Sequence, residues 1–188
     1  MSYVWIIVLL SIGAGVGVLL ERRMERSFNK HSKWNYILPI VITACLCIRF
    51  DDPISVIKGL IFSTVLLWAA NTDIHTHHAS DSLSVMIAIT AFIGIVPSDI
   101  PNMLCGALVC FLPQILVNML IPDRAVGGAD IKISTACGLL LGVTRGAIGL
   151  VVGLTASVII SLIQRKKNDE KLPLIPYLAL GFIPAYFI

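Results

Sequence analysis

Long runs of apolar residues follow one another along almost the whole of this 188-residue chain. Hydrophobic residues make up 57% of the sequence and charged residues 13%, whereas a soluble domain has roughly 45–50% and 25%. So little charge cannot cover a water-facing surface, and the length of the runs favours membrane spans. We therefore predict an all-α, polytopic membrane protein that forms one membrane-embedded domain over residues 1–188.

The apolar runs define about eight transmembrane or partly spanning helices. We expect these helices at 3–20, 36–49, 54–71, 82–97, 103–121, 131–142, 146–163 and 172–188. The runs 36–49 and 131–142 are shorter than the roughly 20 residues that cross a bilayer, so tilt or local thinning would accommodate them. Basic residues follow the first run instead of preceding it, which predicts a retained anchor and not a signal peptide.

The basic residues lie mainly on alternate loops between these runs. Five Lys or Arg residues fall in 21–35 and four in 164–171, whereas the loops on the opposite side hold only Arg49 and Arg145. By the positive-inside rule the first set of loops faces the cytoplasm, and both termini lie outside. The cytoplasmic loops are then 21–35, 71–81, 122–130 and 164–171. The net charge of +3 is too small to indicate a nucleic-acid partner, so the bilayer is the expected environment.

Asp73 and Asp130 adjoin apolar runs at the predicted cytoplasmic face. An ionised carboxylate at membrane depth costs roughly 2.5–3.5 kcal/mol, so such residues are rarely accidental. Two aspartates brought together share a proton, and such a pair activates water with one member and protonates a carbonyl oxygen with the other. Each could instead be a solvated residue at a helix end. The residues next to each aspartate in the sequence favour one of these two interpretations.

Gly127, Gly128 and Ala129 directly precede Asp130. Glycine allows positive φ and close approach of another part of the chain. Irregular backbone at membrane depth is tolerated only where protein or a water-filled cavity satisfies it. We therefore expect a turn that delivers Asp130 into a half-buried site.

The segments around both aspartates resemble the type IV prepilin peptidases, a family of GxGD-type intramembrane aspartic proteases. The similarity includes the stretch 73–81 (DIHTHHASD) and the GGADIK sequence at 127–132. Residues 136–142 resemble the small-residue run of the family, and residues 176–181 (PYLALG) resemble its closing motif. The resemblance covers most of the chain from about residue 55. Ala129 stands where the family has a third glycine, and Ser80 stands where it commonly has proline.

The resemblance implies that Asp73 and Asp130 form the catalytic dyad and that Gly127 and Gly128 shape the backbone around Asp130. Lys132 matches a basic residue of the motif, with its role left open. The implied substrates are type IV prepilins or pseudopilins, which lose a short basic leader at the cytoplasmic face of the bacterial inner membrane. No cofactor is implied.

Many members of this family also N-methylate the new terminus and carry a large cytoplasmic insertion after the first span, often with paired CxxC motifs. Here the corresponding loop, 21–35, has about 15 residues and contains no cysteine. The sequence therefore favours a short form that cleaves, and methylation is doubtful.

Three histidines, His75, His77 and His78, follow Asp73 and invite a zinc hypothesis. The resemblance offers a simpler interpretation, a basic interfacial stretch that here contains histidines in place of arginines. We expect no metal site, and protonation of these histidines could tune activity near neutral pH.

Two other functional classes remain open on the sequence alone. Asp73, Asp130 and Lys58 could be intramembrane charges of a small ion- or proton-coupled transporter, or the aspartates could be structural contacts in a non-catalytic subunit. Two further carboxylates near the proposed dyad are interpreted as structural, with Asp81 as a helix N-cap and Asp123 paired with Arg124 in a turn.

Overall fold

The computed structural model describes residues 3–28, 34–77, 79–120, 126–164 and 173–188. Over these ranges every regular element is a helix and no strand is present. The helices are α1 (Tyr3–Phe28), α2 (Trp34–Arg49), α3 (Pro53–Thr76), α4 (Asp81–Ala91), η1 (Pro97–Asp99), α5 (Ile100–Leu120), α6 (Gly128–Gln164) and α7 (Ile175–Ala185). The predicted all-α class is confirmed. His78, Asp123 and Arg124 lie outside the described residues.

Several helix ends differ from the limits of the apolar runs. α1 runs to Phe28 instead of ending at residue 20, and α3 and α4 also end elsewhere than expected. α3 continues five residues beyond the expected end at 71, so Asp73 lies within its last turn instead of following it. α4 ends at Ala91, although its apolar run was expected to reach residue 97. Gly94 has a φ of 64°, and Pro97 begins the 3₁₀ turn η1. Both features are incompatible with a continuous helix there.

The long helix α6 reverses direction at Gly142. This glycine has φ 76° and ψ −172°, which is not helical. A Cβ built on Gly146 would lie 3.2 Å from the Cα of Gly138, whereas eight residues of straight helix would separate the two by roughly 12 Å. The chain therefore folds back into two antiparallel arms, 128–141 and 143–164, which confirms the break expected after residue 142.

Within the described ranges, three helices are long and apolar enough to cross a membrane: Pro53–Thr76, Pro97–Leu120 and Gly128–Ile163. The third contains the reversal at Gly142, so its length is shared between two arms. Four shorter helical stretches are also apolar, and they are Val8–Leu19, Ile37–Arg49, Asp81–Ala91 and Ile175–Ala185. The chain is a multi-pass membrane protein.

The chain divides into two compact units, Met1–Thr64 and Val65–Ile188, and the boundary falls within α3. In the first unit, α1 packs against α2. A Cβ on Gly13 would collide with the side chain of Thr43, so a glycine is needed where these helices meet. The Thr43 hydroxyl donates a hydrogen bond to the carbonyl of Pro39, 2.6 Å away, which keeps this buried polar group satisfied. The expected single domain stays a prediction.

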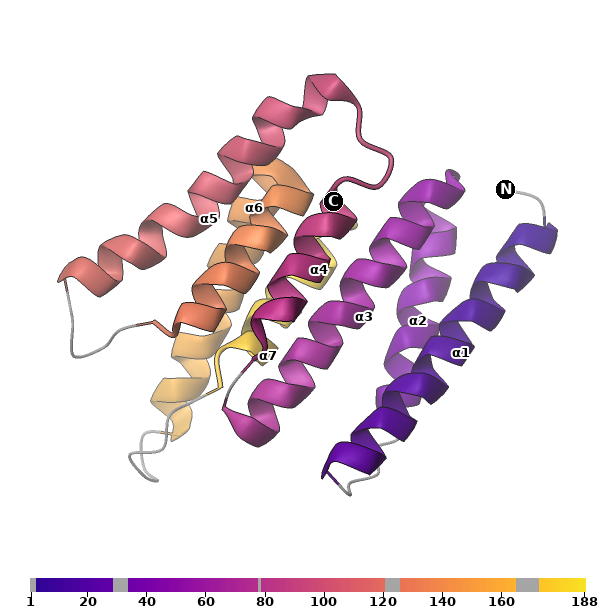
Figure 1. Ribbon diagram of the computed structural model, residues 1–188, viewed down its shortest axis with the longest axis horizontal. Coiled ribbons are helices and arrows are strands. Elements are labelled where there is room, and N and C mark those ends of the chain that lie inside the picture. Colours follow the sequence, from indigo (N-terminus) through magenta and orange to yellow (C-terminus); the bar gives the residue numbers. More distant parts are fainter. Residues whose placement is uncertain (1–2, 29–33, 78, 121–125, 165–172) are drawn as a thin grey trace. The chain divides into compact units, whose positions relative to one another are not determined.

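In the second unit α4, α5 and α7 all pack against α6 (Figure 1). Glycines allow these close contacts. A Cβ on Gly106 of α5 would collide with the carbonyl of Gly138, and one on Gly153 would lie 2.9 Å from the Cα of Leu178 in α7. Asn102 of α5 accepts a hydrogen bond from the N–H of Val143 at 3.2 Å. It thus caps the second arm of α6 just after the reversal.

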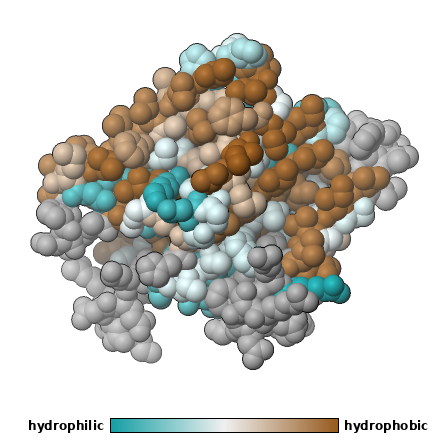
Figure 2. Space-filling model, viewed as in Figure 1, coloured by the Kyte–Doolittle hydropathy of each residue, from teal (hydrophilic) through white to brown (hydrophobic). Residues whose placement is uncertain are grey.

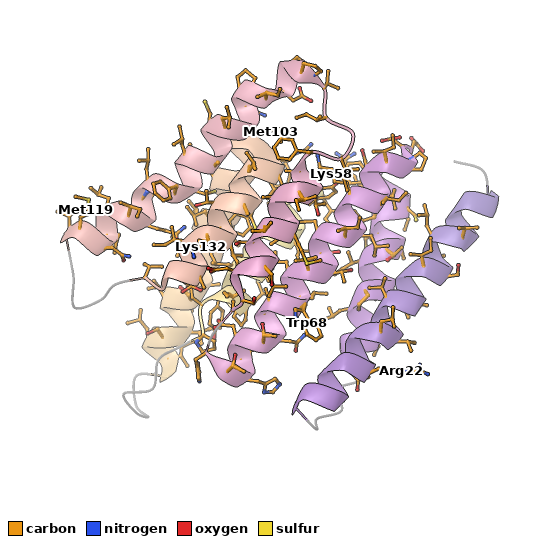
Figure 3. The ribbon with its side chains drawn as sticks, viewed as in Figure 1. Arg22, Lys58, Trp68, Met103, Met119 and Lys132 are labelled. Carbon is orange, nitrogen blue, oxygen red and sulfur yellow. The ribbon has the colours of Figure 1, made fainter. Side chains whose placement is uncertain are left out.

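α5 carries a stripe of exposed leucines at helical spacing. Figure 2 shows hydrophobic side chains along this helix. Met103 at its start is buried, whereas Met119 near its end is 76% exposed (Figure 3). The exposed stripe consists of Leu104, Leu108, Leu112, Leu116 and Leu120. Leucines at every fourth position form one helix face, and we assign that face to lipid.

Candidate active site

One end of the second unit brings together residues from the ends of four helices. Asp73 lies in the last turn of α3, Asp81 is the first residue of α4, Asp130 lies in the first turn of α6 and Ile175 begins α7. Hydrogen bonds, an ion pair and electrostatic interactions connect them. This grouping agrees with the predicted alternation, in which the loops 71–81, 122–130 and 164–171 share one side of the membrane.

Asp73 is buried, with 6% of its surface exposed. Its Oδ2 accepts a hydrogen bond from the backbone N–H of Ile175 at 3.1 Å. The first N–H groups of a helix lack partners within the helix, and Ile175 is the first residue of α7. The carboxylate therefore satisfies one of these groups and lies at the positive end of the α7 dipole.

Asp130 is the third residue of α6 and is partly exposed. Its carboxylate accepts a hydrogen bond from the backbone of Gly127, and the Gly127 carbonyl accepts the N–H of Ile131 at 3.2 Å. A carboxylate in the first turn that reaches back to the residue before the helix is half of a capping box. The local sequence thus holds the Asp130 side chain close to the helix start.

The two glycines before Asp130 have different roles. A Cβ on Gly127 would lie 2.8 Å from Oδ2 of Asp130, whereas a Cβ on Gly128 would meet nothing within 4 Å. Neither glycine has positive φ; within the described ranges the glycines with positive φ are Gly94 and Gly142. Neither residue therefore needs to be glycine for a positive φ, and their expected role in shaping the backbone around Asp130 stays a prediction. Gly127 leaves space for the carboxylate, and Gly128 has no steric need to be glycine.

The carboxylates of Asp73 and Asp130 lie close enough to interact electrostatically. Each accepts a backbone N–H at the start of a helix, and a helix N-terminus carries roughly half a positive charge that stabilises an anion. Their mutual repulsion opposes two full negative charges at this spacing.

Lys132 extends from α6 two residues after Asp130 (Figure 3). Its Nζ forms an ion pair with Oδ2 of Asp81 at 2.7 Å, and the two side chains are 55% and 68% exposed. The N-cap of α4 is Ser80, whose hydroxyl accepts the N–H of Ser82. The expectation that Asp81 is the N-cap is therefore wrong by one residue, because the serine that replaces the family's proline takes that position.

Two of the three histidines are described. His75 lies in the last turn of α3, and His77 follows the helix with a φ of 51°. Histidine is among the residues enriched in this left-handed region, and His77 thereby ends α3 soon after Asp73. Among the described residues, which omit His78, no group of three or more His, Cys, Asp or Glu is placed to hold a metal ion.

The N-terminus of α7 is a part of this site that the sequence did not reveal. The signal for a helix start was present, because Pro176 occupies one of its first positions and proline is common there. Nothing in the sequence indicated that this helix start would face Asp73.

Residues 60–164 match the sequence profile of the type IV leader peptidase family. The chain belongs to this family. The match includes both aspartates and the glycine turn, and it ends before α7. The prepilin leader peptidase/N-methyltransferase of Bacillus subtilis (strain 168) is 29% identical over 180 residues, which cover 89% of this chain and 72% of that relative. No solved structure matches the chain.

Membership of a peptidase family makes this protein a membrane-embedded peptidase. It favours the enzyme over the transporter and the non-catalytic subunit, the two alternatives that the sequence left open.

Proposed function

We propose that this protein removes the leader of type IV prepilins or pseudopilins with Asp73 and Asp130 as its catalytic dyad. The observation that carries the proposal is the placement of these two carboxylates. They interact electrostatically although they come from different helices, and each accepts a backbone N–H at the start of a helix. The family and the named activity of the relative from Bacillus subtilis support the substrate class.

In the proposed reaction the dyad holds one proton. The ionised aspartate accepts a proton from water, whose oxygen attacks the carbonyl carbon of the scissile peptide, while the protonated aspartate donates its proton to the carbonyl oxygen. As the tetrahedral intermediate collapses, the C–N bond breaks and the aspartate that took the proton from water donates it to the leaving amine. The other aspartate takes a proton back from a hydroxyl of the intermediate, so the dyad again holds one proton. The backbone N–H groups of Ile175 and Gly127 take no part in proton transfer. They keep their hydrogen bonds to Asp73 and Asp130 and so hold the two carboxylates in place throughout the reaction.

The proposal also includes the orientation and the type of product. The dyad acts at the cytoplasmic face of the bacterial inner membrane, and both termini lie outside. This orientation is supported by the basic residues of loops 21–35 and 164–171. Cleavage occurs without N-methylation, in keeping with the short segment 21–35 between the first two apolar runs, which contains no cysteine.

The test is leader removal from a prepilin by the purified protein in detergent or liposomes. Mass spectrometry of the mature N-terminus reports the cleavage point and any methyl group in one measurement. We expect cleavage by the wild type, none by Asp73→Asn or Asp130→Asn, and no methyl group after addition of S-adenosylmethionine. Leader removal that persists in both variants refutes the dyad, and a methylated product refutes the cleavage-only form.

A further inference from the structure

α5 carries two amide side chains one helical turn apart, Gln114 and Asn118, within an otherwise apolar run. Residues four apart lie on the same helix face, and both amides make hydrogen bonds to the segment that contains Asp130. A polar side chain in a membrane helix is expensive and is usually functional, so the contacts of this pair indicate its role.

Asn118 binds the chain before Asp130. Its Nδ2 donates to the carbonyl of Val126 at 3.1 Å, and its Oδ1 accepts the N–H of the same residue. One side chain thus satisfies both backbone groups of Val126, which lies directly before the Gly127–Gly128 turn. This double contact fixes the position and the orientation of the peptide that enters the turn.

Gln114 binds the chain after Asp130. Its Nε2 donates to the hydroxyl of Ser134, and that hydroxyl donates to the backbone carbonyl of Asp130 at 2.8 Å. Both Gln114 and Ser134 are buried, with exposures of 2% and 0%. The chain of hydrogen bonds therefore connects α5 to the main chain of Asp130 itself through one intermediate group.

Stability alone does not account for Gln114. Its Nε2 also donates to the carbonyl of Cys110 at 2.8 Å, but its Oε1 is buried and has no hydrogen-bond partner among the described residues. A buried oxygen without a partner opposes folding, and an apolar side chain of the same size would avoid this cost. We therefore explain the glutamine by the hydrogen bond that its Nε2 donates to Ser134, which holds the first turn of α6 in place.

We propose that Gln114 and Asn118 are positioning residues that bracket Asp130, with Val126 held four residues before it and Ser134 four residues after it. The bracket keeps the Asp130 carboxylate at the spacing from Asp73 that peptide hydrolysis requires. This inference rests on the proposed function, because it assigns the two amides to the same dyad.

The bracket is tested by removing each contact and measuring kcat and KM for leader cleavage. Gln114→Met and Asn118→Leu keep the approximate volume and remove the hydrogen bonds. We expect kcat to fall about 10- to 100-fold, the loss typical of a small misplacement of a reacting group, with KM changed less than about twofold. Ser134→Ala breaks the Gln114 contact from the other side, so the Gln114→Met/Ser134→Ala double variant should lose no more than either single variant.

Asn102→Leu is the matched control. It removes an amide from the same helix and a hydrogen bond to α6, at the reversal near Gly142 instead of at Asp130. We expect a lower melting temperature and an unchanged kcat for the folded protein. A similar fall of kcat in this control would show that any lost hydrogen bond between α5 and α6 lowers activity. It would overturn the proposal that Gln114 and Asn118 position Asp130.

Two further results would also overturn it. One is a kcat within twofold of wild type in folded Gln114→Met and Asn118→Leu proteins. The other is a KM that rises while kcat stays constant, which would assign the amides to substrate binding. Failure of the proposed function is separate, because cleavage would then persist in Asp130→Asn.

Discussion

The backbone N–H of Ile175 and Oδ2 of Asp73 form a 3.1 Å hydrogen bond across 102 residues of sequence. The bond joins the end of α3 to the start of α7 and is buried. It gives Asp73 two separable roles, a structural acceptor for α7 and a proposed catalytic acid or base. Two substitutions of Asp73, one that keeps a hydrogen-bond acceptor for the Ile175 N–H and one that does not, can therefore separate the effect on stability from the effect on activity.

Asp73→Asn and Asp73→Ala should both abolish leader cleavage but differ in stability. Asparagine keeps an oxygen that accepts the Ile175 N–H, whereas alanine leaves that buried donor without a partner, which costs about 1–3 kcal/mol. We expect the free energy of unfolding in detergent to be lower for Asp73→Ala than for Asp73→Asn by about this amount. Equal stabilities would show that the hydrogen bond contributes nothing to the fold.

Much of the helical architecture follows from local sequence. Run length and composition are sufficient to predict membrane helices, and the break at Gly142 was expected because the apolar pattern is interrupted there. The ends of α1, α3 and α4 were placed less well. Hydropathy does not register that a helix can continue through Asn71, Thr72 and Asp73, nor that Gly94 stops one inside an apolar run.

The site could be predicted only where its residues form a contiguous pattern. Asp73 and Asp130 were found because each is a carboxylate next to an apolar run, within a recognisable motif. The hydrogen-bond partner of Asp73 lies 102 residues away in the sequence, and one sequence contains no information on which helix faces meet. Gln114 and Asn118 were visible as polar residues in an apolar run, but their contacts with Ser134 and Val126 depend on how α5 packs against α6.

The Lys132–Asp81 ion pair should contribute to activity more clearly than to stability. Both side chains are exposed, and such pairs contribute roughly 0–1 kcal/mol. Lys132→Ala and Asp81→Ala should therefore change the free energy of unfolding by less than about 1 kcal/mol. Because the pair connects the first residue of α4 to α6 beside Asp130, we expect each variant to lower kcat, by less than about tenfold.

The charge-swapped double variant, Asp81→Lys with Lys132→Asp, checks this interpretation. It restores the attraction with the signs reversed, so kcat should recover relative to the two alanine variants. A double variant that remains as slow as the single ones would indicate that Lys132 or Asp81 acts through its own charge and not through the pair.

Asp52 should make the stability of α3 depend on pH. Its carboxylate accepts the backbone N–H groups of Ile54 and Ser55 at 3.3 and 3.0 Å, and the hydrogen bonds from Ser55 hold its pKa below the usual value. A lowered pKa in the folded state means that this stabilisation is present above the unfolded pKa of about 3.9. It is lost as the pH falls through the folded pKa.

Asp52→Asn is the appropriate comparison, because asparagine caps a helix well without a titrating group. The melting temperature of the wild type should fall more steeply below about pH 4 than that of Asp52→Asn. Asp52→Ala should be less stable than both at neutral pH. If the melting temperatures of wild type and Asp52→Asn fall in parallel with pH, the pH dependence does not come from the hydrogen bonds that the Asp52 carboxylate accepts at the start of α3.

Gly127 and Gly128 offer a matched pair for testing how closely the dyad is held. Gly127→Ala would bring a methyl group to 2.8 Å from Oδ2 of Asp130, whereas Gly128→Ala would place one in open space. The Asp130 side chain must move to admit the first methyl group, so we expect Gly127→Ala to fold but to lose kcat by about 10- to 100-fold. Gly128→Ala should retain activity and change the free energy of unfolding by less than about 1 kcal/mol, because the preference for alanine over glycine reaches that size only in a helix interior and Gly128 is the first residue of α6. If both variants lose activity equally, the requirement for glycine lies in the backbone of the turn and not in the space beside the Asp130 carboxylate.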